Sequence, residues 1–203
     1  MILYLIRHGQ TDYNMRGMLQ GGTDIPLNEQ GRELAQEAAR KWEALSIDFA
    51  VTSPLSRAKE TARIVLGQRD VPLVTDDRIR EISFGEFEGL CYKGEGCNVP
   101  DPDFMDFFDA PCKYKTPPGA ESFAEILART GQFWQELQGR DEYQNKTILI
   151  STHGCALKAI LANICNTPLE QFWGTGCSAN CALTCVEVKD GKVTVWENVP
   201  GSR

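Results

Sequence analysis

The chain has only two histidines, and both stand in the same local context. His8 follows the apolar run ILYLI and one arginine, and His153 follows the apolar run TILIS and one threonine; a glycine comes next in both places. An imidazole can attack an electrophile or exchange a proton near neutral pH. One such histidine would more often be structural, but two in matching contexts favour a shared chemical site.

Two strands must position these histidines. The short apolar runs at 2–6 and 147–152 are typical of strands that are buried on both faces. In an open parallel sheet, the ligand crevice lies beyond the carboxyl ends of the strands. We therefore expect His8 and His153 to project into one crevice, although they lie far apart in the chain.

Two arginines indicate what this crevice holds. Arg7 directly precedes the first histidine, and Arg57 lies in a helix predicted over about 54–66, with Ser53 as its cap and Pro54 at its first position. A guanidinium offers a planar fork of donors that fits phosphate oxygens. The helix after the second histidine would add free backbone N–H groups. Each arginine alone is more often a surface ion-pair partner, but together these groups predict a phosphate site.

The remaining pattern predicts an α/β fold. Apolar runs alternate with amphipathic ones, which indicates a mainly parallel central sheet with helices on both faces and C-terminal hairpin strands around a turn at 189–191. Residues 1–203 fit a single domain, with an insertion at about 90–120 near the site. Strands are expected at 2–6, 47–53, 71–75, 147–152, 182–188 and 192–198, and helices at 28–45, about 54–66, 121–137 and 156–165.

Composition limits the partners. The net charge of -7 argues against nucleic acid and anionic membranes, but local arginines can still hold a small anion. No apolar run reaches the length of a membrane span, and MILYLI does not resemble a signal peptide, so we expect a cytoplasmic protein. No cofactor is indicated. The oligomeric state stays open, with a homodimer as one alternative.

The eight cysteines fit reduced thiols, because nothing in the chain indicates secretion. Their spacing does not match the paired C-x-x-C of a structural zinc site. Small buried hydrophobic residues are the simpler interpretation, although a metal site stays open.

An ordered set of motifs extends over most of the chain. The blocks are R-H-G-Q-T-x-x-N at 7–14, L-N-E-Q-G at 27–31, T-S-P-L-S-R-A-x-E-T-A at 52–62, E-I-S-F-G-E-F-E-G at 81–89, P-P-G-A-E-S at 117–122 and T-H-G at 152–154. In this order they resemble the histidine phosphatase superfamily, in its phosphoglycerate mutase-like branch. The ordered set is far more specific than R-H-G alone.

The resemblance implies a metal-independent phosphomonoester hydrolase that acts on a small phosphorylated metabolite. His8 would be the nucleophile that forms a phosphohistidine. Arg7, Arg57 and His153 would hold the phosphoryl oxygens as charge shifts during transfer. Asn14 matches an asparagine that commonly contacts the phosphate.

The leaving oxygen needs a proton and the attacking water later needs a base, and one carboxylate can serve both steps. Spacing alone does not choose it among the acidic residues of the loops, which are Asp12, Asp24, Glu81, Glu86 and Glu88. The resemblance assigns the role to Glu81, the first residue of E-I-S-F-G-E-F-E-G.

A phosphatase is favoured over a mutase. Phosphoglycerate mutases of the family carry basic and tyrosine residues just after the catalytic glutamate, whereas residues 82–88 here are acidic and aromatic. The chain is also shorter, and it is similar to the broad-specificity and α-ribazole phosphatases. A bisphosphate-primed phosphoglycerate mutase or a sugar bisphosphatase stays the alternative, with Lys113 and Lys115 as candidates for a second anion site.

Three further alternatives stay open. Phe104, Phe107 and Phe108 have one-face helical spacing, so they either pack on the body or form a lid over the substrate. A non-catalytic phospholigand-binding protein on this fold would lack a nucleophile, an arginine or the acid, and none is missing. Metal-dependent hydrolysis would need a third ligand beside the two histidines, and the pattern supplies none.

Overall fold

A six-stranded sheet in the order β3-β2-β4-β1-β5-β6 organises the computed structural model, which describes residues 1–94 and 96–197. Strands β1 to β4 are parallel to one another, β5 pairs antiparallel with β1, and β5 and β6 form an antiparallel hairpin. Their bounds are β1 Ile2–Arg7, β2 Phe49–Thr52, β3 Leu73–Thr75, β4 Thr147–Thr152, β5 Leu183–Lys189 and β6 Lys192–Trp196. The predicted mainly parallel sheet and the hairpin are confirmed; Asn198, expected in the last strand, lies outside the described residues.

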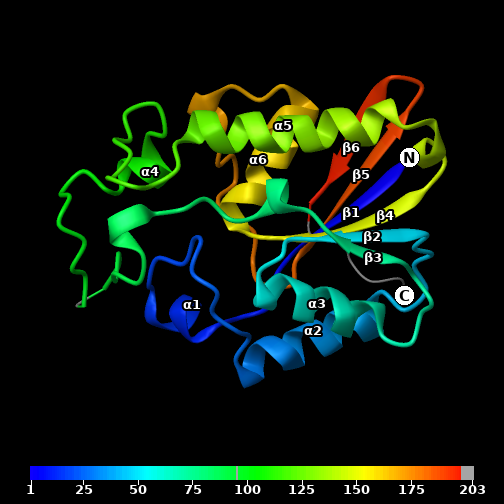
Figure 1. The fold of residues 1–203 in the computed structure, drawn as a ribbon, viewed down its shortest axis with the longest axis horizontal. Helices are drawn as coiled ribbons and strands as arrows, with labels where there is room; N and C mark the ends of the chain where they lie inside the picture. Colours follow the sequence, from blue (N-terminus) through cyan, green and yellow to red (C-terminus); the bar gives the residue numbers. More distant parts are fainter. Residues whose placement is uncertain (95, 198–203) are drawn as a thin grey trace.

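Helices cover both faces of this sheet, as predicted (Figure 1). Helices α2 (Glu29–Lys41) and α3 (Ser56–Leu66) lie on one face, and α5 (Phe123–Gly139) and α6 (Gly154–Cys165) on the other. The alternation of side chains along the central strand β4 explains the arrangement. Ile148 and Ile150 are buried with side chains of α5 and α6, whereas Leu149 is buried with side chains of α2 and α3. No helix of the described residues is long and apolar enough to cross a membrane.

Several element bounds differ from the sequence prediction. Helix α3 begins at Ser56 and not at Pro54, because Leu55 still has an extended backbone and Ser53 accepts the Leu55 N–H at 3.3 Å instead of capping the helix. Helix α6 begins directly after His153, two residues earlier than expected. The short helices that the sequence did not predict are α1 Asp12–Arg16, α4 Asp106–Asp109, η1 Asp77–Ile79, η2 Gly85–Phe87, η3 Asp141–Tyr143 and η4 Leu169–Gln171.

The segment 86–118, which contains most of the predicted insertion, begins and ends at the same point of the body. Glu86 N–H donates to the Pro118 carbonyl at 3.2 Å. Gly85 has a φ of +55°, and a Cβ at this position would lie 2.3 Å from the same carbonyl oxygen, so only glycine fits the close approach. The segment therefore forms a loop whose two ends touch.

An aromatic cluster attaches this loop to the body. The Phe107 side chain is 1 % exposed, and its ring lies 5.2 Å from Phe84, 5.1 Å from Phe123 and 5.3 Å from Trp173, measured between ring centroids. Phe104 is buried in the same cluster. The interpretation that the phenylalanines pack on the body is confirmed for Phe104 and Phe107, whereas Phe108 is half-buried against the same cluster.

The cysteines differ from the simplest expectation. All eight are free thiols, but only Cys155 and Cys181 are buried. Four others are exposed, and the remaining two are half-buried. The interpretation as small buried hydrophobic residues is therefore wrong for most of them, because their spacing alone does not show which face of an element they occupy.

Candidate active site

The two histidines meet because strands β1 and β4 are direct neighbours. Arg7 and Thr152 are paired in the parallel register, so the residues that follow them leave the sheet at the same edge. His8 N–H donates to the Thr152 carbonyl at 2.9 Å, and the ring centroids of His8 and His153 lie 5.1 Å apart. The structure brings together the two histidines that the sequence placed in one crevice.

The contacts of His8 define its tautomer. Nδ1 lies 2.7 Å from the Gly9 carbonyl oxygen, which can only accept, so Nδ1 carries the proton and Nε2 keeps its lone pair. The side chain is 2 % exposed. This burial, together with the positive charges of Arg57 and Arg7, lowers the pKa of His8 well below its ordinary value. His8 is therefore a neutral imidazole with one free nitrogen at neutral pH.

His153 is oriented on both sides of its ring. Arg57 Nε donates to Nδ1 at 3.2 Å, so the proton is on Nε2, which donates to Ser53 Oγ at 2.7 Å. Burial first, and then the positive charges of Arg57 and Arg7, lower the pKa of His153 well below its ordinary value. Ser53, expected as a helix cap, instead holds this histidine in place.

Arg57 is completely buried beneath the site. Besides its bond to His153, it donates to the Thr23 carbonyl and to the Gly21 carbonyl, each at 2.8 Å. Burial lowers the pKa of Arg57 to about 10, so the guanidinium stays charged at neutral pH. Within residues 1–94 and 96–197, three of its five N–H groups are used, and one remains on each terminal nitrogen for an anion.

Buried donors without acceptors also face this region. Among the described residues, three buried side-chain nitrogens have no hydrogen-bond partner: Arg7 Nε and Gln20 Nε2 in this region, and Trp42 Nε1 elsewhere. Asn14, predicted as a phosphate contact, accepts the Thr11 N–H with its Oδ1, which leaves its amide N–H groups to donate. The side chains of Arg7, Gln20 and Asn14 line one cavity. Because an unsatisfied buried donor is costly, they indicate an anionic or carbonyl-rich ligand.

Gln20 is a site residue that the sequence analysis missed. Its Oε1 accepts the Thr11 hydroxyl at 2.5 Å, which turns the amide nitrogen toward the cavity. Thr11 is at the same time the cap of helix α1, with a capping box to Asn14. The capping pattern T-x-x-N at 11–14 was the one local signal that could have indicated an ordered turn here.

The side chain of Glu81 lies against the N-terminus of helix α6, which is distant from it in the chain. Its carboxylate accepts the N–H groups of Cys155 and Ala156 at 3.1 and 3.0 Å, and that of Ile82 at 3.0 Å. The backbone donors of this helix, expected to face a phosphate, are therefore partly occupied by Glu81. The oxygen Oε2 lies 3.6 Å from the position that a Cβ on Gly154 would take, directly beside His153 in the chain.

The other acidic candidates have different structural tasks. Glu88 accepts the backbone N–H groups of Gly21, Gly22 and Phe84. Asp24 accepts the Ser56 N–H and hydroxyl at 2.7 Å and so caps helix α3, Asp12 accepts an Asn28 N–H at 3.4 Å, and Glu86 is exposed. Of the five carboxylates, only that of Glu81 lines the cavity.

The cavity has a volume of about 290 Å³ and an aromatic wall. Tyr92, Phe107, Phe108 and Trp173 form this wall, with Lys93 beside them. His8, Arg57 and His153 are too deeply buried to line the cavity. His8 adjoins it through its chain neighbour Arg7, and His153 through its chain neighbour Gly154.

The lysine that lines the cavity differs from the two that the sequence suggested for a second anion site. Lys113 and Lys115 do not line the cavity, and Lys115 faces Asp103 at 3.9 Å on the surface. Lys93 lies there instead, because the Tyr92 N–H donates to the Gly17 carbonyl and the aliphatic part of the Lys93 side chain lies beside Gly17. A larger cavity of about 570 Å³ shares the wall residues Phe108 and Trp173 but contains none of the predicted site residues.

Anion-binding groups around a histidine pair, at the carboxyl edge of a parallel sheet, define a class of protein, the phosphoglycerate mutase-like α/β enzymes. Comparison with known proteins agrees. The model of the histidine phosphatase superfamily (branch 1) matches residues 3–198. The chain belongs to this superfamily, and it is a phosphatase-type enzyme that needs no metal ion.

Individual relatives cover nearly the whole chain. The adenosylcobalamin/alpha-ribazole phosphatase of Escherichia coli is 31% identical over 176 residues, 85% of this chain and 83% of that protein. Phosphoserine phosphatase 1 of Hydrogenobacter thermophilus is 27% identical over 188 residues, 93% and 87% of the two chains. The solved structure of Bacillus stearothermophilus YhfR has a TM-score of 0.87 and 36% identity, and covers 99% of this chain and 98% of that one. Phosphoglycerate mutases are further relatives.

Proposed function

We propose that this enzyme hydrolyses a small phosphomonoester through a phosphohistidine on His8. The observation that carries the proposal is the bond between His8 Nδ1 and the Gly9 carbonyl, because it leaves the lone pair of Nε2 free in a neutral ring. A neutral, oriented imidazole is what nucleophilic attack on phosphorus requires. The free N–H groups of Arg7, Arg57 and Asn14 would bind the phosphoryl oxygens.

In the first step, the bond between His8 Nε2 and phosphorus forms as the bond from phosphorus to the leaving oxygen breaks. Glu81, protonated at this stage, gives its proton to that oxygen, and the alcohol leaves. In the second step, Glu81 takes a proton from a water molecule, which attacks phosphorus and releases phosphate and free His8. His153 and the two arginines stabilise the charge on the phosphoryl oxygens in both steps.

The rest of the substrate would lie against the aromatic wall. A cavity of about 290 Å³ suits a small metabolite. Lys93 supplies one positive charge there, which supports a substrate with a second acidic group. The same charge favours the alternative, a bisphosphate-primed phosphoglycerate mutase or a sugar bisphosphatase. The negative charge of Glu88 does not face this part of the cavity, because its carboxylate accepts the backbone N–H groups of Gly21 and Gly22.

The test is phosphate release from a panel of phosphomonoesters in EDTA. The panel includes phosphoserine, 3-phosphoglycerate, sugar phosphates, nucleotides and α-ribazole phosphate. Release by the wild type and none by His8→Ala is the expected result. Glu81→Gln should slow turnover severely, whereas Glu86→Gln, which removes an exposed carboxylate of the same loop, should not. Release that persists in His8→Ala contradicts the phosphohistidine, and mutase activity with a bisphosphate primer would favour the alternative.

We also infer that residues 1–203 act as one domain in the cytoplasm, with the insertion at about 90–120 contributing to the substrate side of the cavity. Limited proteolysis tests the first part, since one domain should be cut at the termini or loop tips before any stable fragment appears. A stable fragment of half the chain would contradict it.

A further inference from the structure

Arg129 of helix α5 uses all five of its N–H groups inside the protein. Two of them bind the two carboxylate oxygens of Glu121, at 2.5 and 2.7 Å. The other three donate to backbone carbonyls of one short segment, those of Arg78, Arg80 and Glu81, at 2.7, 2.8 and 3.2 Å. A planar guanidinium with five partners has a single orientation, so it also fixes the backbone to which it binds.

Glu121 extends this contact along the same segment. Its own N–H donates to the Ser83 carbonyl at 2.9 Å. The side chains of Arg129 and Glu121 are only 20 % and 18 % exposed, and their two parallel hydrogen bonds form the bidentate geometry of a strong ion pair. The pair therefore fastens the segment 78–83 to the beginning of α5.

Glu81 is thus held at both ends. Helix α6 binds its carboxylate through two backbone N–H groups, and Arg129 binds its backbone carbonyl. Arg129 itself does not line the cavity. We propose that Arg129, together with Glu121, is a positioning residue that sets the distance between the Glu81 carboxyl group and the leaving oxygen of the substrate. This inference rests on the role of Glu81 in the proposed function.

Loss of this pair should impair proton donation more than phosphoryl binding. An alkoxide leaves only with a proton, whereas 4-nitrophenolate leaves readily without one. A displaced acid should therefore lower kcat/KM for an alkyl phosphate by about tenfold to a hundredfold and for 4-nitrophenyl phosphate by less than about threefold. A purely structural role would lower both by the same factor.

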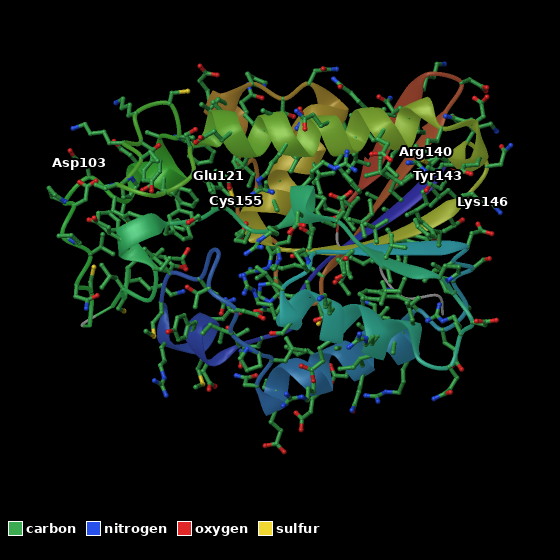
Figure 2. The ribbon with its side chains drawn as sticks, viewed as in Figure 1. Asp103, Glu121, Arg140, Tyr143, Lys146 and Cys155 are labelled. Atoms are coloured by element: carbon green, nitrogen blue, oxygen red, sulfur yellow. The ribbon has the colours of Figure 1, made fainter. Side chains whose placement is uncertain are left out.

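The experiment measures the ratio of kcat/KM for the alkyl phosphate to kcat/KM for 4-nitrophenyl phosphate, in the wild type and in Arg129→Gln. This parameter reports phosphoryl transfer to the enzyme, and the ratio cancels the fraction of folded protein. Arg140→Gln is the matched control, because Arg140 pairs only with Glu136 and Glu142 among the described residues, at the opposite end of α5 from Glu121 (Figure 2). Glu81→Gln shows how far the ratio changes when the acid is absent.

The expected result is a ratio that falls in Arg129→Gln in the same direction as in Glu81→Gln and is unchanged in Arg140→Gln. An unchanged ratio in Arg129→Gln, with Glu81→Gln still discriminating, overturns the inference and leaves the proposed function standing. If Glu81→Gln itself does not discriminate, the proposed acid is wrong and the inference falls with it. Should Arg129→Gln not fold, Glu121→Gln decides in the same way, with a smaller fall expected because the carbonyl contacts remain.

Discussion

The two buried histidines should make the enzyme lose stability as the pH falls below neutral. Burial and nearby positive charge lower the pKa of His8 and of His153 in the folded protein. In the unfolded chain, each has an ordinary pKa of about 6.5. Between these two values the unfolded state binds more protons than the folded state, so the free energy of unfolding decreases as the pH decreases. The stability is fully present above the unfolded pKa and is lost progressively below it.

The size of this loss follows from the count of histidines. Lowering the pH from about 7.5 to about 5.5 adds about one proton to each unfolded histidine over a range worth about 1.4 kcal/mol, hence about 2.7 kcal/mol for two. The chain has no third histidine. Carboxylates whose pKa is lowered, such as Asp76 and Glu136, titrate below this range, and thiols whose pKa is raised titrate above it.

Urea unfolding followed by tryptophan fluorescence at the two pH values measures the effect. The wild type should lose about 2.7 kcal/mol, and His8→Gln, which keeps one buried histidine, should lose about 1.4 kcal/mol. The comparison within each variant removes any constant cost of the substitution. A wild-type loss below about 0.5 kcal/mol, or an equal loss in His8→Gln, would refute the conclusion that both rings are held neutral by the fold.

Three other substitutions test the site and its support. Phe108→Ala removes part of the cavity wall, and the kcat/KM values of the substrate panel should change relative to one another; a uniform change would indicate packing only. Ser53→Ala deletes a buried hydrogen-bond partner of the second histidine, and the free energy of unfolding should fall by about 1–3 kcal/mol, together with kcat. Gly31→Ala places a methyl group 2.1 Å from the Gln10 carbonyl oxygen, and urea unfolding should show a loss of about 1–3 kcal/mol or more. Gly139→Ala, with open space around it, should cost nothing, and equal behaviour of the two glycine variants would contradict the close approach.

The histidine pair was predictable because it depends on two local patterns and one topological rule. Each strand is an uninterrupted apolar run, and parallel strands bring their carboxyl ends to the same edge. Arg7 and Arg57 followed from their places near the strand ends, and Asn14 and Glu81 from motif blocks. Arg7, Asn14 and Glu81 line the cavity, and Arg57 is buried against His153.

What the sequence did not reveal depends on contacts between distant segments. The amide of Gln20 faces the cavity only because Thr11 binds its oxygen, and Ser53 reaches a histidine 100 positions away. Three of the five bonds of Arg129 join α5 to a segment about 50 residues earlier, which no periodicity shows. Helix and strand identity are encoded locally, whereas hydrogen-bond partners are decided by the packed fold.

Two different parts of the chain contribute to the site, and the touching ends of the segment 86–118 mark the boundary between them. The groups assigned to phosphoryl transfer come from strand ends and helix starts that the sheet holds in register. Tyr92, Lys93 and Phe108, which contact the remainder of the cavity, come from a loop that leaves and rejoins the body at Gly85 and Pro118. Such a loop can be lengthened, shortened or grafted from a relative at little entropic cost to the rest of the chain. Changes confined to this loop can therefore alter the substrate preference, while the groups assigned to phosphoryl transfer stay the same.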